Sequence, residues 1–320
     1  MKLILQIPCY NEAEQLPETL AALPRTVPGF DTVEILVIDD GSTDGTAEVA
    51  REAGVDHVVV LPHNEGLARA FSIGLEAGLM RGADVILNLD ADNQYSAASI
   101  PALVAPIVAG EAQIVVGARP IGKIETFSPV KRTLQQLGSW VVRLLSGTDI
   151  PDAPSGFRAM TAEAATRLYV FSSYSYTLET IIQAGRLGIP MTWVPVEVNP
   201  PTRPSRLMKS MLGYILRSAV TIVRIFVLYN PLRFFTGLAA IAATPGIIVF
   251  VRFLLLYLDG EGQGHVQSLV IGGALLAVAA VTFVGGLIAD LVAANRIVLT
   301  EIRARLLRDR VAEARRREAA

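Results

Sequence analysis

The first two hundred residues alternate short apolar runs with amphipathic stretches. Six runs rich in branched apolar residues are predicted to form strands, at 3–7, 33–39, 57–61, 84–90, 113–117 and 191–196. Between them, apolar residues recur at helical spacing in segments such as 12–23, 45–53, 66–81 and 97–109. Strands that are apolar throughout and joined by crossover helices are typical of a mostly parallel sheet covered on both faces. The pattern therefore predicts an α/β domain over residues 1–204.

The last third of the chain contains two apolar segments that are much longer than a strand. They cover residues 232–258 and 268–294, and about 20 helical residues suffice to cross the hydrocarbon core of a bilayer. The link between them, 259–265, contains no Lys or Arg, whereas arginines flank both segments. By the positive-inside rule, this pattern predicts a two-helix transmembrane hairpin over 231–294 with both ends in the cytoplasm. A pair of buried helices in a soluble core is the alternative.

The segments on either side of this hairpin are basic. Residues 205–230 form an apolar stretch whose basic residues fall on one side of a helix, namely Arg206, Lys209, Arg217 and Arg224. This pattern is typical of an amphipathic helix lying against anionic lipid headgroups, and a core helix with one solvated face is the alternative. The tail, 295–320, is predicted to be a basic cytoplasmic helix that is solvated or lies on the lipid surface.

The composition agrees with a membrane-attached protein whose N-terminal domain lies in the cytoplasm. The chain is 52% hydrophobic with a mean hydropathy of +0.45, and its net charge is only −2. No basic and aromatic platform for nucleic acid is visible. The single cysteine, Cys9, cannot form an internal disulfide and suits a reducing compartment, and the three histidines show no metal-ligand spacing. The first apolar run is short for a signal peptide, so we expect a cytoplasmic N-terminal domain.

Polar residues gather where three of the predicted strands end. The cluster PCYNE (8–12) follows the first strand, DDGSTDGT (39–46) follows the second, and DADNQY (90–95) follows the fourth. Ligands of open parallel sheets bind at the carboxyl ends of the strands, so we expect the three clusters to converge. Burying this much polarity beside a sheet is costly unless a charged partner compensates it.

The third cluster has the composition of a site for a hard divalent cation. Mg²⁺ and Mn²⁺ prefer oxygen ligands and share their shell with substrate phosphates. Asp92 and the amide oxygen of Gln94 could supply two ligands, while Asp90 binds directly or orients the shell. For an Asp-x-Asp pair standing alone, an ordinary turn is the alternative. The second cluster contains helix-capping residues, leaves Asp39 and Asp40 free for a base and a ribose, and lacks the Gly-x-Gly-x-x-Gly loop of dinucleotide sites.

Five motifs occur in an order that resembles family-2 glycosyltransferases with the GT-A fold. They are PCYNE, VIDDGSTDGT, HNEGLARAFSIGL, LNLDADNQY and PSGFRAM. The chain is most similar to the dolichol-phosphate mannose synthase-like branch, the polyprenyl-phosphate glycosyltransferases, over about residues 1–210. The two-helix hairpin also fits branch members with C-terminal membrane helices. The resemblance implies inverting, metal-dependent transfer of a hexose from a UDP- or GDP-sugar to undecaprenyl or dolichyl phosphate at the cytoplasmic membrane face.

The same resemblance implies roles for individual residues. The nucleotide-sugar would be held by Pro8, Tyr10, Asn11, Glu12, Asp39, Asp40 and Asp90. Mg²⁺ or Mn²⁺ on its diphosphate would be held by Asp90, Asp92 and Gln94. The acceptor phosphate would be contacted by Arg119, Arg132, Ser155, Arg203 and Arg206. Of all these, the resemblance makes Asp92, Arg119 and Arg132 the catalytic residues. Three positions depart from the family pattern, namely Gln136, Pro204 and Arg206.

A polyprenyl phosphate acceptor simplifies the chemistry that the protein must supply. This acceptor is already anionic near neutral pH, so no dedicated general base is required, and positioning with charge neutralisation suffices. For the arginines, the alternatives are a surface charge for Arg119 or Arg132, and membrane attachment alone for Arg203 and Arg206. Arg158 could simply pair with Asp152 in its own loop.

Two other functions stay open at this point. A membrane glycosyltransferase acting on a polysaccharide or glycolipid is one, although residues 183–188 lack the Trp of the Gln-x-x-Arg-Trp motif and two spans offer no polymer channel. A non-catalytic nucleotide-binding membrane subunit is the other, and the intact acidic cluster counts against it. The identity of the sugar, the length of the lipid and a homo-oligomeric state are also open.

Overall fold

The computed structural model describes residues 1–120, 129–170, 176–199, 220, 223–224, 226–260 and 266–318. The chain divides into two compact units. The first comprises Met1–Ser218 together with Thr300–Ala320, and the second comprises Ala219–Leu299.

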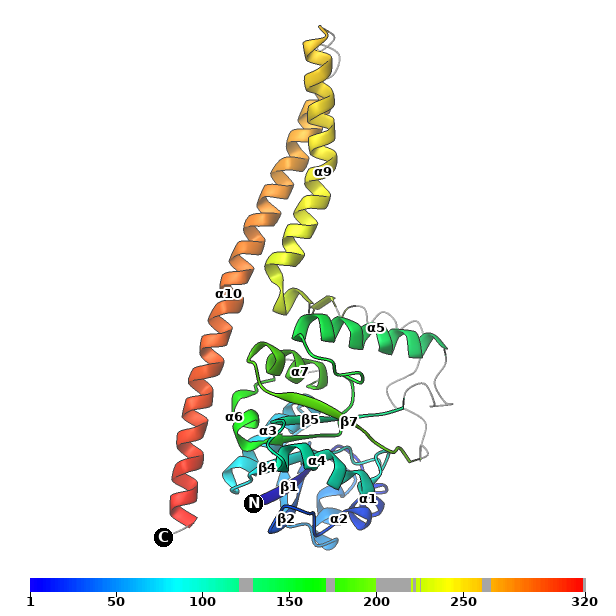
Figure 1. The fold of residues 1–320 in the computed structure, drawn as a ribbon, viewed down its shortest axis with the longest axis vertical. Helices are drawn as coiled ribbons and strands as arrows, with labels where there is room; N and C mark the ends of the chain where they lie inside the picture. Colours follow the sequence, from blue (N-terminus) through cyan, green and yellow to red (C-terminus); the bar gives the residue numbers. More distant parts are fainter. Residues whose placement is uncertain are drawn as a thin grey trace. The chain divides into compact units, whose positions relative to one another are not determined.

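A seven-stranded sheet forms the centre of the first unit (Figure 1). Its strands are β1 (Lys2–Cys9), β2 (Thr32–Asp39), β3 (His57–Val60), β4 (Val85–Asn88), β5 (Ile114–Ala118), β6 (Arg158–Thr161) and β7 (Met191–Pro195). They are ordered β3-β2-β1-β4-β6-β5-β7, and all pairs are parallel except those that β6 makes with β4 and β5. The predicted mostly parallel α/β sheet is therefore confirmed.

Strand β6 is the one strand of this sheet that the hydrophobic pattern does not predict. It has only four residues, and its first is the charged Arg158, which is nevertheless buried. A charged residue in so short a run interrupts the apolar pattern from which strands are predicted. Because β6 is antiparallel, it brings the PSGFR segment back to the sheet edge where β4 ends.

Helices cover both faces of this sheet. They are α1 (Leu16–Ala22), α2 (Thr46–Glu52), α3 (Leu67–Met80), α4 (Ile100–Val108), α5 (Pro129–Ser146), α6 (Ala162–Arg167) and α7 (Thr177–Arg186), with a short 3-10 turn at Ala97–Ser99. Side chains alternate along β1, so Leu3, Leu5 and Ile7 join a core with α1 and α4. Ile4 and Ile86, which pair across β1 and β4, face Gly78 of α3 on the opposite side. Each fully buried Leu or Ile contributes about 1.5–3 kcal/mol to folding.

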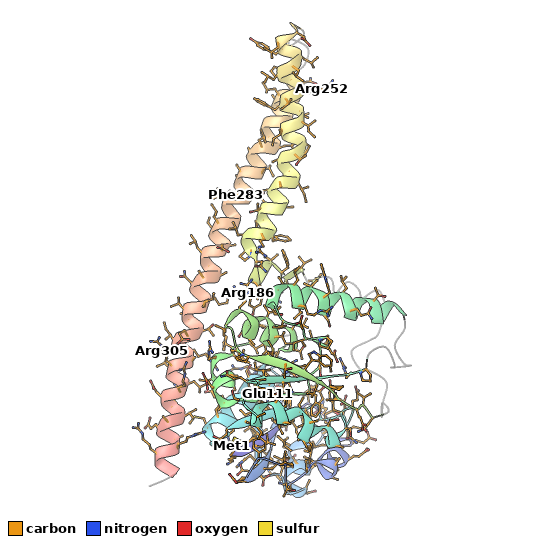
Figure 2. The ribbon with its side chains drawn as sticks, viewed as in Figure 1. Met1, Glu111, Arg186, Arg252, Phe283 and Arg305 are labelled. Carbon is orange, nitrogen blue, oxygen red and sulfur yellow. The ribbon has the colours of Figure 1, made fainter. Side chains whose placement is uncertain are left out.

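The second unit contains the two long apolar helices. Helix α9 spans Pro231–Leu258, and α10 spans Val266–Glu318, so α10 runs on into the first unit. Within the described ranges, these are the helices long and apolar enough to cross a membrane. Their apolar side chains are largely exposed, as in Leu258 at 72% and Val281 at 73% (Figure 2). Exposure of this kind fits an apolar surrounding.

Two glycines bring α9 and α10 together as a hairpin. A Cβ atom added to Gly246 would lie 3.1 Å from the carbonyl oxygen of Gly272, and one added to Gly272 would lie 3.2 Å from that of Gly246. Small residues permit such close backbone approach between membrane helices. The predicted helical pair is therefore found, whereas the predicted amphipathic segment 205–230 lies almost entirely outside the described residues.

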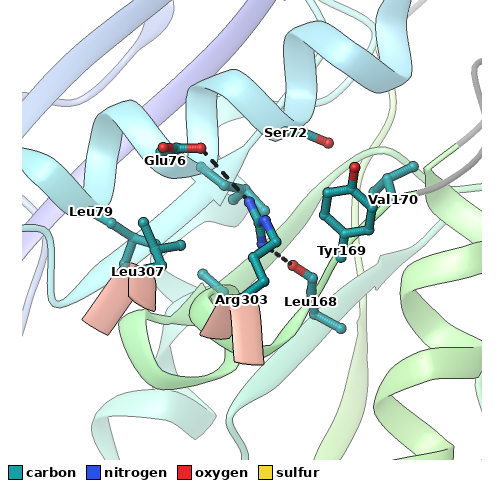
Figure 3. A pocket seen from close by; sticks show the side chains of 10 residues that line it. Ser72, Glu76, Leu79, Leu168, Tyr169, Val170, Arg303 and Leu307 are labelled. Atoms are coloured by element: carbon teal, nitrogen blue, oxygen red, sulfur yellow. Dashed lines mark hydrogen bonds and ion pairs between the residues drawn. The ribbon is translucent and has the colours of Figure 1, made fainter. Parts of the chain in front are cut away.

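The end of α10 packs onto the α/β domain (Figure 3). Arg303 donates from Nη1 to the carbonyl oxygen of Leu168 at 3.3 Å and approaches Glu76 on α3 at 3.7 Å. Its guanidinium carbon lies 4.6 Å from the ring centroid of Tyr169. Ala304, the next residue along the helix, is also buried. This docking differs from the solvated or lipid-lying tail that the sequence predicts. The sequence does not predict it because isolated small apolar residues in a charged segment give little signal.

Candidate active site

The three polar clusters converge, as expected, at one edge of the sheet. Strands β2, β1 and β4 are adjacent and parallel, so their carboxyl ends lie side by side. The amide of Asp40 donates to the carbonyl oxygen of Cys9 at 2.8 Å, which joins the first two clusters. The hydroxyl of Thr19, on α1, donates to the carbonyl oxygen of Ala91 at 2.7 Å. Helix α1 thus fastens the third cluster beside the first.

The first two clusters are tied together by side chain to backbone hydrogen bonds. Asn11 has a left-handed backbone with φ of 52°, a conformation that asparagine tolerates. Its amide donates to Ser42 Oγ and its Oδ1 accepts from the amide of Thr43, both at 2.9 Å. The amide of Glu12 donates to Thr46 Oγ1, also at 2.9 Å. Ser42 and Thr46 therefore connect the loops, and α2 begins without a side-chain cap.

Asp39 and Asp40 are both buried and already accept backbone hydrogen bonds. Asp39 Oδ1 accepts from the amide of Ser42 at 2.9 Å. The two oxygens of Asp40 accept from the amides of Glu65 and Gly66, each at 2.8 Å. Burial raises the pKa of Asp40, and these two amides oppose the rise. Asp40 thereby fixes the loop that leads into α3, and direct contact of both aspartates with a base or ribose stays a prediction.

Pro8 and Tyr10 take contrasting positions at the end of β1. Pro8 is buried in the strand, beyond the last β1–β4 pair of Gln6 with Asn88, where the missing amide removes no hydrogen bond to β4. Tyr10 is 43% exposed. An exposed ring beside the loops suits a stacking contact with a nucleotide base.

The third cluster places two carboxylates close enough to influence each other. Burial, followed by the charge of Asp92, raises the pKa of Asp90 to about 6, while Arg119 and Arg158 oppose the rise. Asp92 Oδ1 accepts from the amide of Gln94 at 3.3 Å. Asn93, between them, repeats the left-handed φ of 52° seen at Asn11. Such backbones cost energy and concentrate at functional sites.

These residues fit a divalent cation whose coordination shell is completed by oxygen atoms of the substrate. In the described part of the chain, no three His, Cys, Asp or Glu side chains are grouped as a ready-made metal centre. Mg²⁺, however, is usually held by one or two carboxylates together with substrate phosphates. The repulsion between Asp90 and Asp92 is the kind of cost that a bound cation relieves. Asp90, Asp92 and Gln94 therefore remain the predicted ligands.

The raised pKa of Asp90 predicts a pH-dependent stability of the metal-free protein. Its folded pKa of about 6 lies above the ordinary value of 3.8, so the folded protein binds the extra proton and loses stability as pH rises through this interval. In chelator, Asp90→Asn should therefore melt at a higher temperature than wild type at pH 8, with a smaller difference at pH 5. The exposed Asp309→Asn is the control. An equal shift at both pH values would contradict the assignment.

Gly156 of the PSGFR motif lies directly against the Asp90 carboxylate. A Cβ atom at this position would stand 2.9 Å from both Asp90 oxygens and 2.8 Å from the hydroxyl of Tyr176. Asn88 Nδ2 donates to the carbonyl oxygen of Gly156 and to Tyr176 Oη, both at 2.9 Å. The motif indicates this segment from sequence, but only the structure shows that the glycine makes room for Asp90.

Arg158 lies beneath the site as a buried cation. It is 1% exposed, and it donates from Nη1 to Thr180 Oγ1 at 2.6 Å and to the carbonyl oxygen of Thr177 at 3.1 Å. Its Nη2 donates to the carbonyl oxygen of Ser155. Burial lowers the pKa of Arg158, and the charge of Asp90 is among the effects that oppose this. The alternative of a simple pair with Asp152 is wrong, because these are its hydrogen-bond partners. Sequence reasoning gave this arginine no functional role.

Asp152 pairs with Arg119 instead. The guanidinium of Arg119 binds both carboxylate oxygens, from Nε at 2.7 Å and from Nη2 at 3.0 Å. The Asp152 side chain is fully buried and that of Arg119 is 17% exposed, so the surface-charge alternative for Arg119 is wrong. The proximity of Arg119 to Asp90 also appears in the pKa of that aspartate. Arg119 therefore acts electrostatically on Asp90, and its contact with an acceptor phosphate stays a prediction.

The structure gives less information on the other residues predicted to contact the acceptor. Ser155 is fully buried, and its hydroxyl lies 3.4 Å from that of Tyr95, so its role toward an acceptor stays a prediction. The backbone of Arg132 lies in α5, but its side chain is outside the described part of the chain. Arg203 and Arg206 also lie outside the described residues.

Comparison with known proteins places this α/β fold with its acidic strand-end cluster in a family. The model described as "Glycosyl transferase family 2" matches residues 5–168. The chain belongs to that family, and its predicted GT-A fold and enzyme class are confirmed.

Two relatives of the chain act on polyprenyl carriers by name. An undecaprenyl-phosphate mannosyltransferase from Micrococcus luteus is 32% identical over 206 residues, which cover 61% of this chain and 83% of the relative. A polyprenol monophosphomannose synthase from Mycolicibacterium smegmatis is 29% identical over 201 residues, which cover 59% and 74%.

A solved structure is similar in fold. It is glucosyl-3-phosphoglycerate synthase from Mycobacterium tuberculosis in complex with Mn²⁺, uridine diphosphate and glucosyl-3-phosphoglycerate. The TM-score is 0.52 at 21% identity, and the match covers 71% of this chain and 78% of the other.

Proposed function

We propose that this glycosyltransferase transfers a hexose from a UDP- or GDP-sugar to a polyprenyl phosphate at the cytoplasmic face of the membrane, with inversion and with Mg²⁺ or Mn²⁺. The observation that carries the proposal is the convergence of Asp90 and Asp92 with the loops after β1 and β2. The two relatives named for undecaprenyl phosphate and polyprenol support the acceptor. The apolar hairpin α9–α10 supports a lipid-borne substrate, because it would hold the enzyme at the bilayer.

The residues of the site divide the work between donor and acceptor. The loops after β1 and β2 would bind the nucleotide, and Asp90, Asp92 and Gln94 would hold the cation. When bound, a divalent cation supplies positive charge that stabilises the departing nucleoside diphosphate. Arg119 and Arg132 would neutralise and aim the acceptor phosphate. One of its oxygens bonds to the anomeric carbon as the bond from that carbon to the diphosphate breaks, which gives a β-linked product from an α-linked donor.

The arginine assignments predict a selective loss of acceptor use. Charge-assisted contacts to phosphate contribute about 1.5–3 kcal/mol, so Arg132→Ala should weaken polyprenyl-phosphate use roughly ten- to a hundredfold. Donor binding should change little, because the cation carries most of the contact with the diphosphate. Kinetics in the acceptor and donor titration on the same variant measure both, with the exposed Arg51→Ala as control. Unchanged acceptor kinetics would move the acceptor site elsewhere.

Arg119 needs a different design because it neutralises a buried carboxylate. Arg119→Ala alone removes the guanidinium that binds both oxygens of the buried Asp152, at a cost of roughly 3–5 kcal/mol in stability. In the double variant Arg119→Ala, Asp152→Ala the charge is removed together with its partner, so the fold should recover while acceptor use stays weak. A double variant with wild-type acceptor kinetics would limit Arg119 to a structural role.

The hairpin predicts the orientation of the protein in the membrane. A reporter fused after Ala320 should read cytoplasmic, because arginines flank both apolar segments. A tag placed near Gly262, in the link without Lys or Arg, should be accessible from outside. An extracytoplasmic reporter at the C-terminus would contradict this orientation.

Donor consumption tests the proposed reaction. Purified full-length protein in detergent would be given UDP- and GDP-linked hexoses, each with and without undecaprenyl phosphate, and release of the nucleoside diphosphate would be followed. We expect release from one donor only when both the polyprenyl phosphate and the divalent cation are present. Release that is indifferent to the lipid would refute the acceptor, and metal-dependent nucleotide binding without any release would favour the non-catalytic alternative.

A further inference from the structure

Two amide side chains are buried side by side in the centre of the sheet. Gln6 on β1 and Asn88 on β4 pair in register, and both are fully buried. The preceding pair on the same face of these strands, Ile4 with Ile86, is apolar. Burying an amide costs more than burying a leucine unless each of its polar atoms has a partner. Such a departure from the apolar pattern of a core is expected mainly at functional or strained sites.

A chain of hydrogen bonds fixes the orientation of both amides. Gln6 Nε2 donates to the carbonyl oxygen of Phe71, on α3, and to Asn88 Oδ1, both at 3.0 Å. The Nδ2 atom of Asn88 is thereby turned toward the carbonyl oxygen of Gly156 and the hydroxyl of Tyr176, to which it donates. The carbonyl oxygens of Phe71 and Gly156 can only accept, so neither amide can be flipped without losing hydrogen bonds.

This chain of hydrogen bonds ends at the groups that border the carboxylate of Asp90. Both Asp90 oxygens and the Tyr176 hydroxyl lie within 2.9 Å of the point where a Cβ atom of Gly156 would stand. The ring of Tyr176 is held in turn by stacking on Phe71, with the ring centroids 3.9 Å apart and the planes at 11°. Asn88 therefore binds the backbone and the hydroxyl that together limit where Asp90 can lie.

Stability alone does not account for this pair of amides. The Oε1 atom of Gln6 is buried and has no hydrogen-bond partner among the residues that the structure describes. An unpaired buried acceptor is unfavourable, and replacing two buried polar partners by apolar groups of similar shape can be neutral or stabilising. Two apolar side chains would therefore suit the fold at least as well. What they could not do is fix the direction of the bond to Gly156.

We propose that Gln6 and Asn88 are positioning residues of the active site, which hold Gly156 and Tyr176 against Asp90 and so fix the place of this carboxylate in the predicted cation site. Asn88 acts on Gly156 directly, and Gln6 acts through Asn88. The inference rests on the proposed function, because it takes Asp90 as part of the cation site. Removing groups that orient a metal ligand typically weakens metal binding or activity about 10- to 100-fold.

Binding of Mn²⁺ to the full-length protein in detergent tests the inference without requiring turnover. Mn²⁺ would be titrated with UDP, and separately with GDP, while the EPR signal of free Mn²⁺ is followed. We expect Gln6→Leu to weaken Mn²⁺ binding roughly tenfold or more. Its melting temperature without metal should stay close to that of wild type, because the change also removes the unpaired Oε1.

Gln113→Leu is the matched control. The Oε1 atom of Gln113 is likewise buried without a hydrogen-bond partner in the described part of the chain. Its Nε2 donates to Glu163 at 3.4 Å, in an exposed contact outside the hydrogen-bond chain that leads to Gly156. This variant should bind Mn²⁺ like wild type.

Two further variants give an expected order of effects. Asn88→Leu removes the bonds to both Gly156 and Tyr176, so it should weaken Mn²⁺ binding most. Tyr176→Phe keeps the ring that stacks on Phe71 and the bond from Asn88 to Gly156, so it should have a smaller effect. Because Tyr176→Phe and Gln6→Leu are mild changes, the inference stays testable if Asn88→Leu does not fold.

The outcomes separate this inference from the proposed function. Wild-type Mn²⁺ affinity in both Gln6→Leu and Tyr176→Phe would overturn the inference and leave the proposed function standing. An equal loss of affinity in Gln113→Leu and Gln6→Leu, or a loss that only follows a lower melting temperature, would limit the network to a role in folding. A wild-type protein that binds no Mn²⁺ with either nucleotide would refute the cation site itself, and the inference with it.

Discussion

Replacing Asp92 with Asn is expected to remove nearly all sugar transfer. The substitution keeps the size of the side chain but deletes the charge that, with Asp90, would hold a divalent cation on the donor diphosphate. Losing a charge-stabilising group of this kind typically slows turnover at least about a hundredfold. Chelation of wild type with EDTA should have the same effect. Added Mg²⁺ or Mn²⁺ should rescue the chelated wild type and leave the variant inactive, as measured by formation of the lipid-linked product.

The exposed Asp309→Asn, on α10, is the matched control for this loss. It removes one aspartate charge from the same protein and should retain full turnover. An Asp92→Asn enzyme that remained fully active in EDTA would show that the third cluster is an ordinary turn, which is the alternative that the sequence leaves open for an Asp-x-Asp pair.

Replacing Gly156 with Ala is expected to have an effect of similar size through geometry alone. The added methyl group would meet both oxygens of Asp90 at 2.9 Å and the hydroxyl of Tyr176 at 2.8 Å, so the carboxylate must move. Overpacking of this kind costs roughly 1–3 kcal/mol in stability. Displacing a reactive group by about 1 Å can cost a hundredfold in rate, so turnover should fall by that order. Thermal unfolding and product formation measure the two effects.

Gly138→Ala provides the comparison within the same protein. A Cβ atom at Gly138, in the interior of α5, would meet nothing within 4 Å. Alanine is favoured over glycine inside a helix by roughly 0.5–1 kcal/mol, so this variant should be slightly more stable and fully active. Wild-type activity in Gly156→Ala would mean that Asp90 does not need its observed position.

The main features of the acidic edge of the sheet follow from the sequence because they depend on local patterns. Apolar runs locate β1, β2 and β4, and parallel pairing then brings their carboxyl ends to one edge. The sequence alone therefore predicts that the clusters beginning at Pro8, Asp39 and Asp90 lie together. The two long apolar helices are visible for a similar reason, since length and composition alone define them.

The features that sequence could not supply depend on contacts between distant residues. The pair of Arg119 with Asp152 joins residues 33 positions apart, and nothing in either local segment indicates the partner. The same holds for Asp40, whose two oxygens bind amides at residues 65 and 66. The buried Arg158 hides β6, because its charge is compensated by hydrogen bonds that only the folded chain provides. Periodicity reports burial of a segment, whereas these roles come from tertiary partners.

The most direct test of the proposed reaction is the chemical identity of the lipid product. Purified full-length protein would be incubated with the donor that it consumes, undecaprenyl phosphate and Mg²⁺ or Mn²⁺, and the extracted lipid would be analysed by mass spectrometry and for its anomeric configuration by NMR. The proposal predicts undecaprenyl phosphate carrying one hexose in β linkage, formed by wild type and absent with Asp92→Asn. An α-linked product would contradict inversion. Transfer of the hexose to a polysaccharide or glycolipid, with undecaprenyl phosphate unchanged, would contradict polyprenyl phosphate as the acceptor.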